Sequence, residues 1–568
     1  RGLSDTDWEK LRNTGLTHLI AISGFHVGIV AGVFALLAGL VWRVLPQLGR
    51  WWPRPLAAAV AAVLGAAGYA AIAGFALPTV RTLLMIAVVA GLRVSRRAVS
   101  AVQALALAAI AILLVDPLAA LTAGFWLSFL GVGWLLWCLP ASGGRSWRDV
   151  SRGFLSAQGV ATLGLLPLTV ALFGQASLAG PFANLLAVPW WSLVVVPLAL
   201  LGTALEAMQA GLGAWSWQLA SLAFDALWPL FERLGHSPLS VWWLPEAHWY
   251  ALPLALFGAF WLLLPRGVPG KLLAALLFLP LLLPPRGLPN HGDAELLLID
   301  VGQGLSVLIR TADGNWLYDT GPAIKDGYDA GERAVVPALR ALGVGRLDGL
   351  ILSHADNDHA GGAAAVLRAF PTANVQAPEG APLTGTQPCR SGEHWQVDGV
   401  RFRFLHPPPD FPYLGNEASC VLHIRARHGS ALLTGDIGEV VERDLLRRYP
   451  RAVHSDVVLI AHHGSNGSSD AGFVDATDAR VAVVSSGHGN RFGHPRPQVL
   501  ARWRASGAAV ADTGQSGAIR IRLQAGGPAV ESRRTTHPRL WDAQRRQRLR
   551  ANAGLSYESG TSRPQTED

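Results

Sequence analysis

The sequence predicts a polytopic α-helical membrane bundle followed by an α/β sandwich domain, and three observations carry this prediction. Hydrophobic residues make up 51% of the 568 positions and charged residues only 15%, whereas a soluble protein carries about 25% charge. Apolar stretches of eighteen or more residues recur between Gly15 and Pro285, and each is long enough to cross a hydrocarbon core of about 30 Å. After Gly292, short β-like runs alternate with helical ones. These features exclude a soluble single-domain protein.

The first half divides into candidate membrane spans, about ten in number, at points marked by Pro, Gly and Arg. Several spans contain an internal Pro, which is tolerated at membrane depth where a broken helix lines a cavity or packs on its neighbours. Arg-rich loops follow both odd and even spans, so the distribution of positive charge leaves the topology open. The spans cover residues 18–42, 55–76, 78–94, 98–115, 118–139, 155–174, 182–208, 213–234, 249–265 and 270–285.

Composition also sets the expected domain boundaries. Residues 1–288 form the membrane domain, a Pro-rich hinge at 283–290 leads into the sandwich domain at 289–523, and 524–568 is an Arg-rich tail that we expect to be disordered. The net charge is +8, and the tail holds much of the excess. A basic tail could contact nucleic acid or anionic lipid, but a solvated tail is our preferred interpretation. The chain opens at Arg1 almost directly before an apolar segment, so we expect that an N-terminal portion precedes it.

The second half reads as strands and helices in alternation, which is typical of sheets covered by helices. We expect two helices, near 334–342 and through 360–370. The predicted strands cover residues 295–299, 306–310, 315–318, 347–352, 401–405, 419–425, 431–433, 457–461 and 481–485.

A loop directly after the apolar run 347–352 concentrates potential metal ligands. It reads His354-Ala-Asp356-Asn-Asp358-His359, which places four candidate ligands within six positions. A loop at the end of a buried strand holds its ligands on a rigid edge, where a divalent cation can bind and activate water. Random sequence seldom packs two His and two Asp in this way, so a metal site is the preferred interpretation.

Further candidate residues follow later predicted strands. Asp436 comes after the strand 431–433, His462 and His463 come after 457–461, and Arg491 and His494 lie beyond 481–485. Because each group sits just after a strand, we expect the side chains to converge on one edge of a sheet. A lone His is more often an ordinary core or surface residue, and this interpretation is preferred for five others: His394, His406, His423, His428 and His454.

Polar residues also occur within or beside the predicted spans. Such groups are costly at membrane depth unless they face the bundle interior or a water-filled cavity. The alternative for each is a hydrogen bond to a neighbouring helix, or, for an Arg at a span end, a side chain that reaches the interface. The candidates for a polar path are Ser23, His26, Arg81, Gln175 and Asn184.

Motifs along almost the whole of 1–523 resemble the ComEC/Rec2 family of DNA internalization competence proteins. In the first half they are Leu16-Thr-His-Leu-Ile-Ala-Ile-Ser-Gly-Phe-His26, Pro78-Thr-Val-Arg81, Asp116-Pro117, Gly124-Phe-Trp-Leu-Ser128, Phe173-Gly174-Gln175 and Asn184-Leu-Leu-Ala-Val-Pro189. In the second half they are Asp300-Val-Gly-Gln-Gly304, Asp319-Thr-Gly321, the loop 353–362, His462-His-Gly-Ser465 and Arg491-Phe-Gly-His494.

The resemblance implies a metallo-β-lactamase-like sandwich and a set of ligands. The family motif His-x-His-x-Asp-His matches 354–359 except that Asp356 replaces the second His. His354 and Asp356 would face one metal, Asp358 and His359 the other, and Asp436 would bridge them, with His462 preferred over His463 as the last ligand. The His that the family places before the bridging Asp is absent, since 416–419 reads Asn-Glu-Ala-Ser. This oxygen-rich set favours Mn²⁺ or Mg²⁺ over Zn²⁺, with one or two ions bound.

The resemblance also implies a function. The chain would be a multi-pass inner-membrane channel for single-stranded DNA in natural transformation, with a tethered nuclease that degrades the other strand. Asp358, Asp436 and His494 would be catalytic, and Ser465, Arg491 and His494 would hold phosphate oxygens. Expected partners are DNA, the lipid bilayer, a DNA receptor and a cytoplasmic motor. A separate motor is expected because the chain lacks the nucleotide-binding loop Gly-x-x-x-x-Gly-Lys-Ser/Thr.

Two alternatives remain open at this point. One is a membrane-anchored metallohydrolase that acts on RNA, nucleotides or lipid phosphodiesters without transport. The other is a DNA channel whose lactamase-like domain is inactive, which the absent His would favour. In the nuclease reading the second domain lies outside the cytoplasm, and a bridge between Cys389 and Cys420 is then permitted, since such bonds persist in oxidising compartments.

Overall fold

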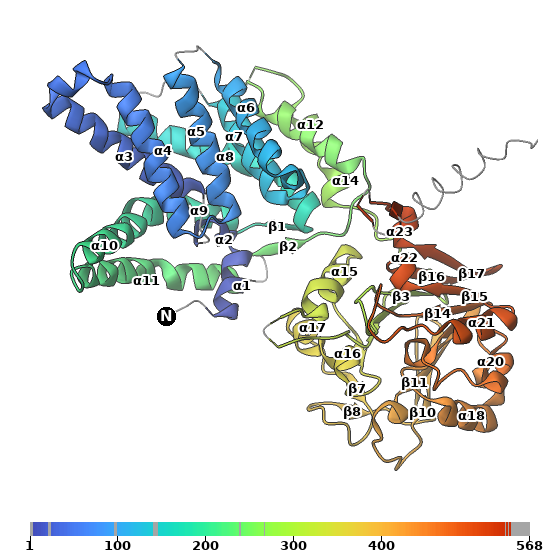
Figure 1. The fold of residues 1–568 in the computed structure, drawn as a ribbon. Coiled ribbons are helices and arrows are strands. Elements are labelled where there is room, and N and C mark those ends of the chain that lie inside the picture. The colour runs from blue at the N-terminus through green and yellow to red at the C-terminus, as the bar shows by residue number, and fades with distance from the viewer. Residues whose placement is uncertain are drawn as a thin grey trace, which may run out of the picture. The chain divides into compact units, whose positions relative to one another are not determined.

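The computed structural model describes residues 4–20, 24–95, 99–139, 146–237, 240–265, 267–325, 327–539, 541–542 and 545–546. These residues form two compact units, 1–285 and 286–568 (Figure 1). The first unit is helical and contains several apolar helices, and the second is rich in β-strands. The predicted fold class is therefore confirmed.

The first unit consists of helices joined by short turns, with a single small sheet among its described residues. In that sheet β1 (Gln175–Ser177) pairs antiparallel with β2 (Val241–Trp243). The helices are α1 (Asp5–Asn13), α2 (Thr17–Ile20), α3 (Gly24–Val44), α4 (Arg54–Ile72), α5 (Leu77–Val94), α6 (Ala101–Val115), α7 (Ala123–Cys138), α8 (Trp147–Phe173), α9 (Gly180–Trp190), α10 (Val196–Met208), α11 (Ala214–His236), α12 (Ala251–Leu263), α13 (Lys271–Leu276) and α14 (Leu279–Leu282).

Several of these helices have the length and composition of membrane spans. Within the described ranges five helical segments qualify, and they are Thr17–Val44, Arg54–Ile72, Leu77–Val94, Trp147–Phe173 and Gly180–Met208. Shorter apolar helices follow the same pattern at Ala101–Val115, Ala123–Cys138, Ala251–Leu263 and Lys271–Leu282. The segment predicted as a span at 213–234 is a long helix, α11, but Asp225, Glu232 and Arg233 make it amphipathic. The count of about ten spans stays a prediction.

Proline breaks the longest apolar segment where the sequence suggested a broken span. Between α9 and α10 the backbone widens into a π-helix at Trp191–Val195. Pro189 and Pro197 lie on either side of this turn, and a proline has no N–H to donate to the preceding turn. The widened turn accommodates the missing hydrogen bonds. Further along, Gly202 lies against the ring of Trp217 so closely that a Cβ would approach within 2.5 Å, which allows α10 to pack on α11.

The second unit is a sandwich of two sheets. One sheet has seven strands in the order β15-β14-β13-β12-β11-β10-β9, and the other has eight in the order β17-β16-β3-β4-β5-β6-β7-β8. The strands are β3 (Ala294–Leu298), β4 (Val307–Arg310), β5 (Asn315–Tyr318), β6 (Gly349–Ile351), β7 (Val375–Ala377), β8 (Gln387–Pro388), β9 (His394–Val397), β10 (Val400–His406), β11 (Val421–Ala426), β12 (Gly429–Leu433), β13 (Val457–Leu459), β14 (Val481–Val484), β15 (Ala509–Asp512), β16 (Ile519–Gln524) and β17 (Gly527–Ser532).

Apolar side chains alternate between the inside and the outside of the sandwich. Leu296 and Leu298 of β3 join Phe402 and Phe404 of β10 in the core between the sheets. Leu297, between them, faces the opposite way and packs with helices α15 (Val336–Ala341) and α17 (Ala363–Ala369). The outer face of the seven-stranded sheet packs on α18 (Glu439–Arg448), α20 (Ala471–Thr477) and α21 (Pro497–Ala505). Figure 1 shows the two helix groups on opposite flanks of this unit.

The structure extends the sandwich beyond its predicted limit. β17 and the short helix α23 (Arg533–Thr536) lie in the segment expected to be a disordered tail. β17 forms a hairpin with β16, and Gly526 and Gly527 supply the positive φ angles of its turn. This hairpin places β17 at the edge of the eight-stranded sheet, so the globular unit continues to Thr536.

Candidate metal centre

The predicted site residues come together at the ends of parallel strands. β5 and β6 are parallel in one sheet, and β12, β13 and β14 are parallel in the other. The candidate ligands follow β6, β12 and β13 directly in the sequence. Carboxyl ends of parallel strands meet at the same edge of their own sheet. The residues converge as expected, but from the strand ends of two sheets rather than from one sheet edge.

One group of potential ligands consists of Asp358, His359 and His463, whose ligand atoms lie within 4.8 Å of one another. The Nε2 atom of His463 lies 3.3 Å from Asp358 Oδ2 and 3.6 Å from Asp436 Oδ2. The Nε2 atom of His359 lies 3.2 Å from Asp436 Oδ1 and 3.2 Å from His463 Nε2. Two imidazole nitrogens and two carboxylates therefore point at one small volume.

A second group consists of His354, His359 and Asp436, all of them buried. The Nε2 atom of His354 is inaccessible to solvent and has no hydrogen-bond partner among the described residues. Asp356 is 56% exposed, and its Oδ2 lies 3.8 Å from this nitrogen. A buried nitrogen without a partner is rare in folded proteins. Its lone pair is free for a cation that Asp356 and Asp436 would share.

The other ring nitrogen of each imidazole is held by the protein. The Nδ1–H of His463 donates to the carbonyl of Ser485 at 2.9 Å. His359 donates its Nδ1–H to Asp319 Oδ2 at 2.8 Å, and Ser353 Oγ lies 3.0 Å from Nδ1 of His354. Contacts of this kind fix the ring orientation and leave Nε2 as the free ligand atom. The donor set therefore fits a divalent cation.

Asp319 contacts the candidate ligand His359, although the sequence analysis assigned it no role. It is fully buried and accepts hydrogen bonds from the backbone N–H and the hydroxyl of Ser353, at 2.6 and 2.7 Å, as well as from His359. Its φ of 59° is in the left-handed region, which Asp adopts more readily than most residues. The signal in the sequence was an Asp directly after a predicted strand and two positions before a Gly.

The structure places His463, rather than the preferred His462, in the ligand group. His463 is buried, whereas the side chain of His462 is 34% exposed and its Nε2 lies 4.0 Å from Asp436 Oδ2. Both residues have positive φ angles, 50° and 52°, and Gly464 follows at 75°. The strand period therefore ends before these two residues, and the turn leaves His463 buried and His462 partly exposed.

Asn416 and Ser419 occupy the region where the sequence lacks the expected His. The Nδ2 atom of Asn416 lies 3.4 Å from His462 Nε2. Ser419 Oγ accepts from the backbone N–H of Asp436 at 3.2 Å and lies 3.5 Å from His354 Nδ1. These contacts support the loops around the site but add no imidazole to the His354 group.

The electrostatics of the cluster favour positive charge. Burial lowers the pKa of His359, but the charges of Asp436 and Asp319 outweigh burial and raise its pKa well above the ordinary value. Burial likewise raises the pKa of Asp436, and the neighbouring His359 and His463 reverse this effect and hold its pKa well below the usual range. Carboxylates that stay ionised while buried are the electrostatic condition for binding a cation.

These residues define which atoms would hold a metal and what it would contribute. Asp358, His359, His463 and Asp436 would hold one divalent cation, and His354, Asp356 and Asp436 a second. A cation bound here supplies Lewis acidity and lowers the pKa of a coordinated water, which is the chemistry of hydrolysis.

Three residues that the sequence analysis assigned to substrate binding are His494, Arg491 and Ser465. The ring of His494 lies 6.2 Å from that of His462, and its Nδ1 is buried and has no partner among the described residues. Asn490 holds the loop, since its side chain exchanges hydrogen bonds with the backbone of His494. Arg491 is exposed and stacks on Phe492, and Ser465 is half-buried at the end of the His462-His463-Gly464 turn.

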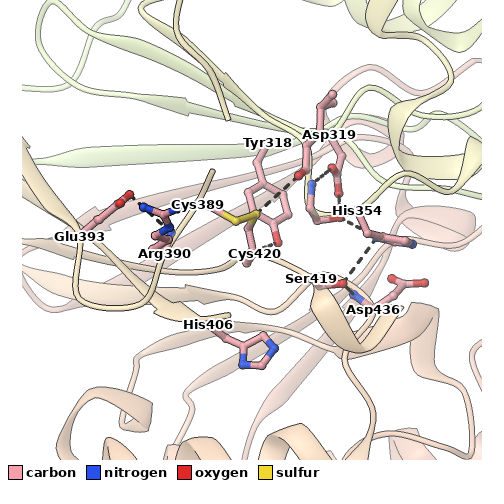
Figure 2. Close-up of a disulfide and its surroundings, with 12 residues drawn as sticks. Tyr318, Asp319, His354, Cys389, Arg390, Glu393, His406, Ser419, Cys420 and Asp436 are labelled. Atoms are coloured by element: carbon pink, nitrogen blue, oxygen red, sulfur yellow. Dashed lines mark hydrogen bonds between the residues drawn. A yellow bond between two sulfur atoms is a disulfide. The ribbon is translucent and has the colours of Figure 1, made fainter. Parts of the chain in front are cut away.

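A disulfide lies directly behind the His354 group. Cys389 and Cys420 are bonded and fully buried in the core between the sheets. Figure 2 shows Cys420 beside Tyr318, Ser419, His354 and Asp436. The Tyr318 hydroxyl donates to the Cys420 carbonyl at 2.7 Å, and the Cys420 N–H donates to the Ser353 carbonyl at 2.9 Å. The bond therefore ties the loop after β8 to the start of β11 at the site.

The predicted channel residues are spread over several elements of the helical unit. His26 is buried on α3, Arg81 lies on α5, Gln175 in β1 and Asn184 on α9. Ser23 lies outside the described residues. The Nε atom of Arg81 and the Oδ1 atom of Asn184 are buried and have no partner among the described residues. The guanidinium of Arg81 lies against Gly124, where a Cβ would approach Nη1 within 2.8 Å. In the described part of the chain no hydrogen bond joins two of these side chains.

Two family profiles match the chain. The profile described as "Competence protein" matches residues 1–269, and that of the metallo-beta-lactamase superfamily matches residues 299–488. The second profile covers every ligand of the candidate centre, so the sandwich has the fold of a metal-dependent hydrolase superfamily.

Three relatives are similar over nearly the whole chain. The sequence is 38% identical to the competence protein ComA of Neisseria gonorrhoeae, over 92% of this chain and 72% of the relative. It is 31% identical to recombination protein 2 of Haemophilus influenzae, over 91% of this chain and 70% of the relative. It is 30% identical to ComE operon protein 3 of Bacillus subtilis, over 91% and 69% respectively. The resemblance seen in the motifs is confirmed.

Proposed function

The chain belongs to the ComEC/Rec2 family of competence proteins, multi-pass membrane proteins of DNA uptake, and from this premise we propose that it is the inner-membrane channel through which single-stranded DNA enters during natural transformation. We further propose that its second unit is a nuclease that degrades the strand that is not transported. This unit then lies outside the cytoplasm, and the bond between Cys389 and Cys420 supports that side of the membrane. A DNA receptor and a cytoplasmic motor complete the pathway as partners.

The observation that carries the nuclease proposal is the convergence of the half-buried Asp358 with the buried His359, Asp436 and His463, with His354 beside them. Water attacks the phosphorus of a phosphodiester and loses a proton to the solvent, the P–O bond to the leaving nucleoside breaks, and that oxygen takes up a proton. Asp358 and Asp436 orient the water, since their oxygens face the shared volume. His494 supplies the proton to the leaving oxygen, and Ser465 and Arg491 hold phosphate oxygens.

The ligand set supports Mn²⁺ or Mg²⁺ over Zn²⁺ as the bound ion. Around His354 the candidate ligands are one imidazole nitrogen, His354 Nε2, and the carboxylates of Asp356 and Asp436. The neighbouring segment 416–419 contributes Asn and Ser rather than His. Carboxylate-rich sites prefer harder ions, although the two imidazoles of the other group fit Mn²⁺ better than Mg²⁺. One or two ions bind in this proposal, and Asp436 bridges them when both are present.

The transport proposal rests on polar groups inside an apolar unit. The buried orphan atoms of Arg81 and Asn184 need a polar partner or water, because an unsatisfied group at membrane depth is costly. A hydrated path for a polyanion provides such partners. His26, Gln175 and Ser23 are the other residues that we assign to this path.

The nuclease proposal is tested with the full-length chain in detergent. Purified protein and an Asp358→Ala variant are incubated with DNA, RNA or a lipid phosphodiester in the presence of Mn²⁺, Mg²⁺ or Zn²⁺. We expect DNA cleavage that depends on Mn²⁺ or Mg²⁺ and is absent in Asp358→Ala, while the exposed control Asp313→Ala cleaves normally. Cleavage of RNA or lipid but not DNA would instead identify a hydrolase without a role in uptake. If no substrate is cleaved in a metal-dependent way, the second unit is inactive. The absence of the His that the family places before the bridging Asp favours this outcome.

The transport proposal is tested separately in cells. A transformable strain lacking its own copy of the gene receives wild-type protein or the variants His26→Ala and Arg81→Ala. We expect fewer transformants with each variant, while cell-surface binding of labelled DNA and membrane levels of the protein stay normal. A transformation frequency equal to that of the wild type with both variants would show that His26 and Arg81 are not part of the DNA path.

A further inference from the structure

The outer face of the seven-stranded sheet carries three arginines among other polar residues, at the end remote from the metal centre. Val400, Phe402 and Phe404 of β10 point into the core between the sheets, so the alternating residues point to the outer face. The same alternation applies to the neighbours β9 and β11. The residues of this face, which we name the arginine face, are His394, Gln396, Arg401, Arg403, His423 and Arg425.

Two arginines of this face stand directly opposite each other. In the register of β10 and β11, Arg401 pairs with Arg425, and both side chains are exposed. Arg403 lies two residues further along β10, about 7 Å away, and stacks on the ring of Tyr449. Like charges in directly opposed positions destabilise a sheet. The pairing of Arg401 with Arg425 therefore destabilises the folded sheet, which suggests that these arginines serve a function other than stability.

No carboxylate compensates the three charges. Among the residues that the structure describes, none lies within ion-pair distance of Arg401, Arg403 or Arg425. Other arginines of the same unit are paired, as Arg310 is with Glu295 at 3.2 Å and Arg443 with Asp470 at 2.7 Å. What distinguishes β10 and β11 is that two of these unpaired arginines stand directly opposite each other, with the third beside them.

We propose that the arginine face binds the phosphate backbone of single-stranded DNA and holds the strand whose end reaches the metal centre. This inference rests on the proposed nuclease function. β9 is the edge strand of its sheet, so the face is open on that side. Arg425 comes six residues after Ser419 at the metal centre, which is about 20 Å along the strand. A polymer can contact both places at once, whereas a mononucleotide cannot.

The chemistry of the face fits nucleic acid better than a lipid surface. Peripheral membrane binding combines positive charge with exposed aromatic or aliphatic side chains that enter the bilayer. In the described part of the chain, none of the exposed large hydrophobic side chains belongs to β9, β10 or β11. A row of arginines without apolar anchors is suited to a polyanion in solution, and each contacted phosphate releases a counterion.

The test measures DNA binding as a function of salt. Full-length protein in neutral detergent, with a chelator to prevent cleavage, is titrated into a labelled single-stranded oligonucleotide at several salt concentrations. The variant Arg401→Gln/Arg425→Gln is compared with Arg346→Gln/Arg480→Gln, which removes the same charge from exposed positions that have Asp partners. We expect the slope of log K against log salt to fall by about 1.4 in the first variant, since each lost phosphate contact contributes about 0.7. The control should keep the wild-type slope.

Other results overturn the inference. An unchanged slope of log K against log salt in Arg401→Gln/Arg425→Gln would do so. The inference would also be overturned if this variant lost binding to phosphatidylserine vesicles while it still bound DNA normally. Thermal unfolding checks the fold, because removing opposed like charges should not lower the apparent Tm.

Cleavage of a dinucleotide tests the proposed nuclease function separately from the arginine face, because so short a substrate does not reach that face. The inference is supported if the variant cleaves the dinucleotide normally but cleaves long DNA with a raised KM. If the wild-type protein cleaves neither substrate, the proposed nuclease function is contradicted. The salt dependence of binding would then still show whether the arginine face contacts DNA.

Discussion

Asp319 Oδ2 accepts the Nδ1 hydrogen of His359 at 2.8 Å, although the two residues are 40 positions apart in the sequence. The same carboxylate also holds the backbone and the hydroxyl of Ser353, which contacts His354. One buried side chain therefore sets the orientation of imidazoles in both ligand groups. Asp319 is a positioning residue, because it contacts the ligands and not the substrate.

The variant Asp319→Asn should weaken metal binding while leaving the backbone unchanged. Asn tolerates the left-handed φ of this position, but it offers one acceptor oxygen where Asp319 uses two. Loss of such an outer partner lowers metal affinity by about 10–100-fold. Titration with Mn²⁺ and competition with a chelator measure the change, and the exposed Asp313→Asn serves as the control. If saturating metal does not restore activity to the variant, Asp319 has a role beyond orientation.

Variants of the two adjacent histidines distinguish the ligand from its neighbour. His463→Asn should lose more metal affinity than His462→Asn, because His463 is the buried residue whose Nε2 faces Asp358. Asn is chosen for both since each position has a positive φ. The loss at His463 should exceed the roughly 10–100-fold that an outer partner contributes. Equal losses, or a larger loss at His462, would return His462 to the ligand role that the sequence analysis preferred.

Removal of the disulfide should loosen the sandwich at the metal centre. The bond closes a segment with a separation of 31 residues, for which chain entropy predicts about 4 kcal/mol of stabilisation. Cys389→Ala/Cys420→Ala should therefore show faster hydrogen exchange in β11 and in the loop after β8, as measured by mass spectrometry. Weaker metal binding should accompany this change, because the Cys420 N–H contacts Ser353. Cys138→Ser, a free cysteine of the helical unit, should leave exchange in both segments unchanged.

Acid should destabilise the sandwich through His406 and His423. The pKa of each falls from 6.5 to about 4, chiefly because burial disfavours the charged imidazole, and for His423 the charges of Arg425 and Arg403 contribute to this shift. The unfolded chain then binds protons that the folded unit does not, so stability is complete above pH 6.5 and is lost as the pH falls toward 4. Each group accounts for about 2 kcal/mol between ~pH 7.5 and ~pH 5.

The variant His423→Leu isolates one of these two groups. It should narrow the difference in apparent Tm between neutral and acidic solution, whereas the exposed His454→Gln should not. An unchanged difference in His423→Leu would mean that other groups dominate the acid response.

The fold was largely predictable because its elements are long or strongly patterned. The strand 315–318 coincides with β5, and the predicted strand at 457–461 begins where β13 begins. Six strands among the described residues of the second unit escaped prediction, namely β7, β8, β9, β15, β16 and β17. β7 and β8 have only three and two residues, too short to show a period, and β17 carries Gly, Pro and Glu that resemble a solvated tail. β17 is defined by its pairing with β16, which is a tertiary contact.

The ligands were predictable from spacing, and their orientation was not. His354, Asp358, His359 and Asp436 follow strands in the sequence and meet as expected. The choice between His462 and His463 depends on a left-handed turn, and the role of Asp319 depends on a hydrogen bond between distant loops. Both are properties of backbone geometry that the residue types permit but do not specify.

The pairing of β3 with β16 determines when the second unit can be finished during synthesis. β3 is the first strand of the unit to leave the ribosome, and its antiparallel partner β16 follows more than two hundred residues later. Until that partner emerges, β3 has an open edge on one side, which invites pairing with other chains. The unit therefore depends on its own last strands for completion. A chain that ends within 481–518 should keep all of the candidate metal ligands yet aggregate.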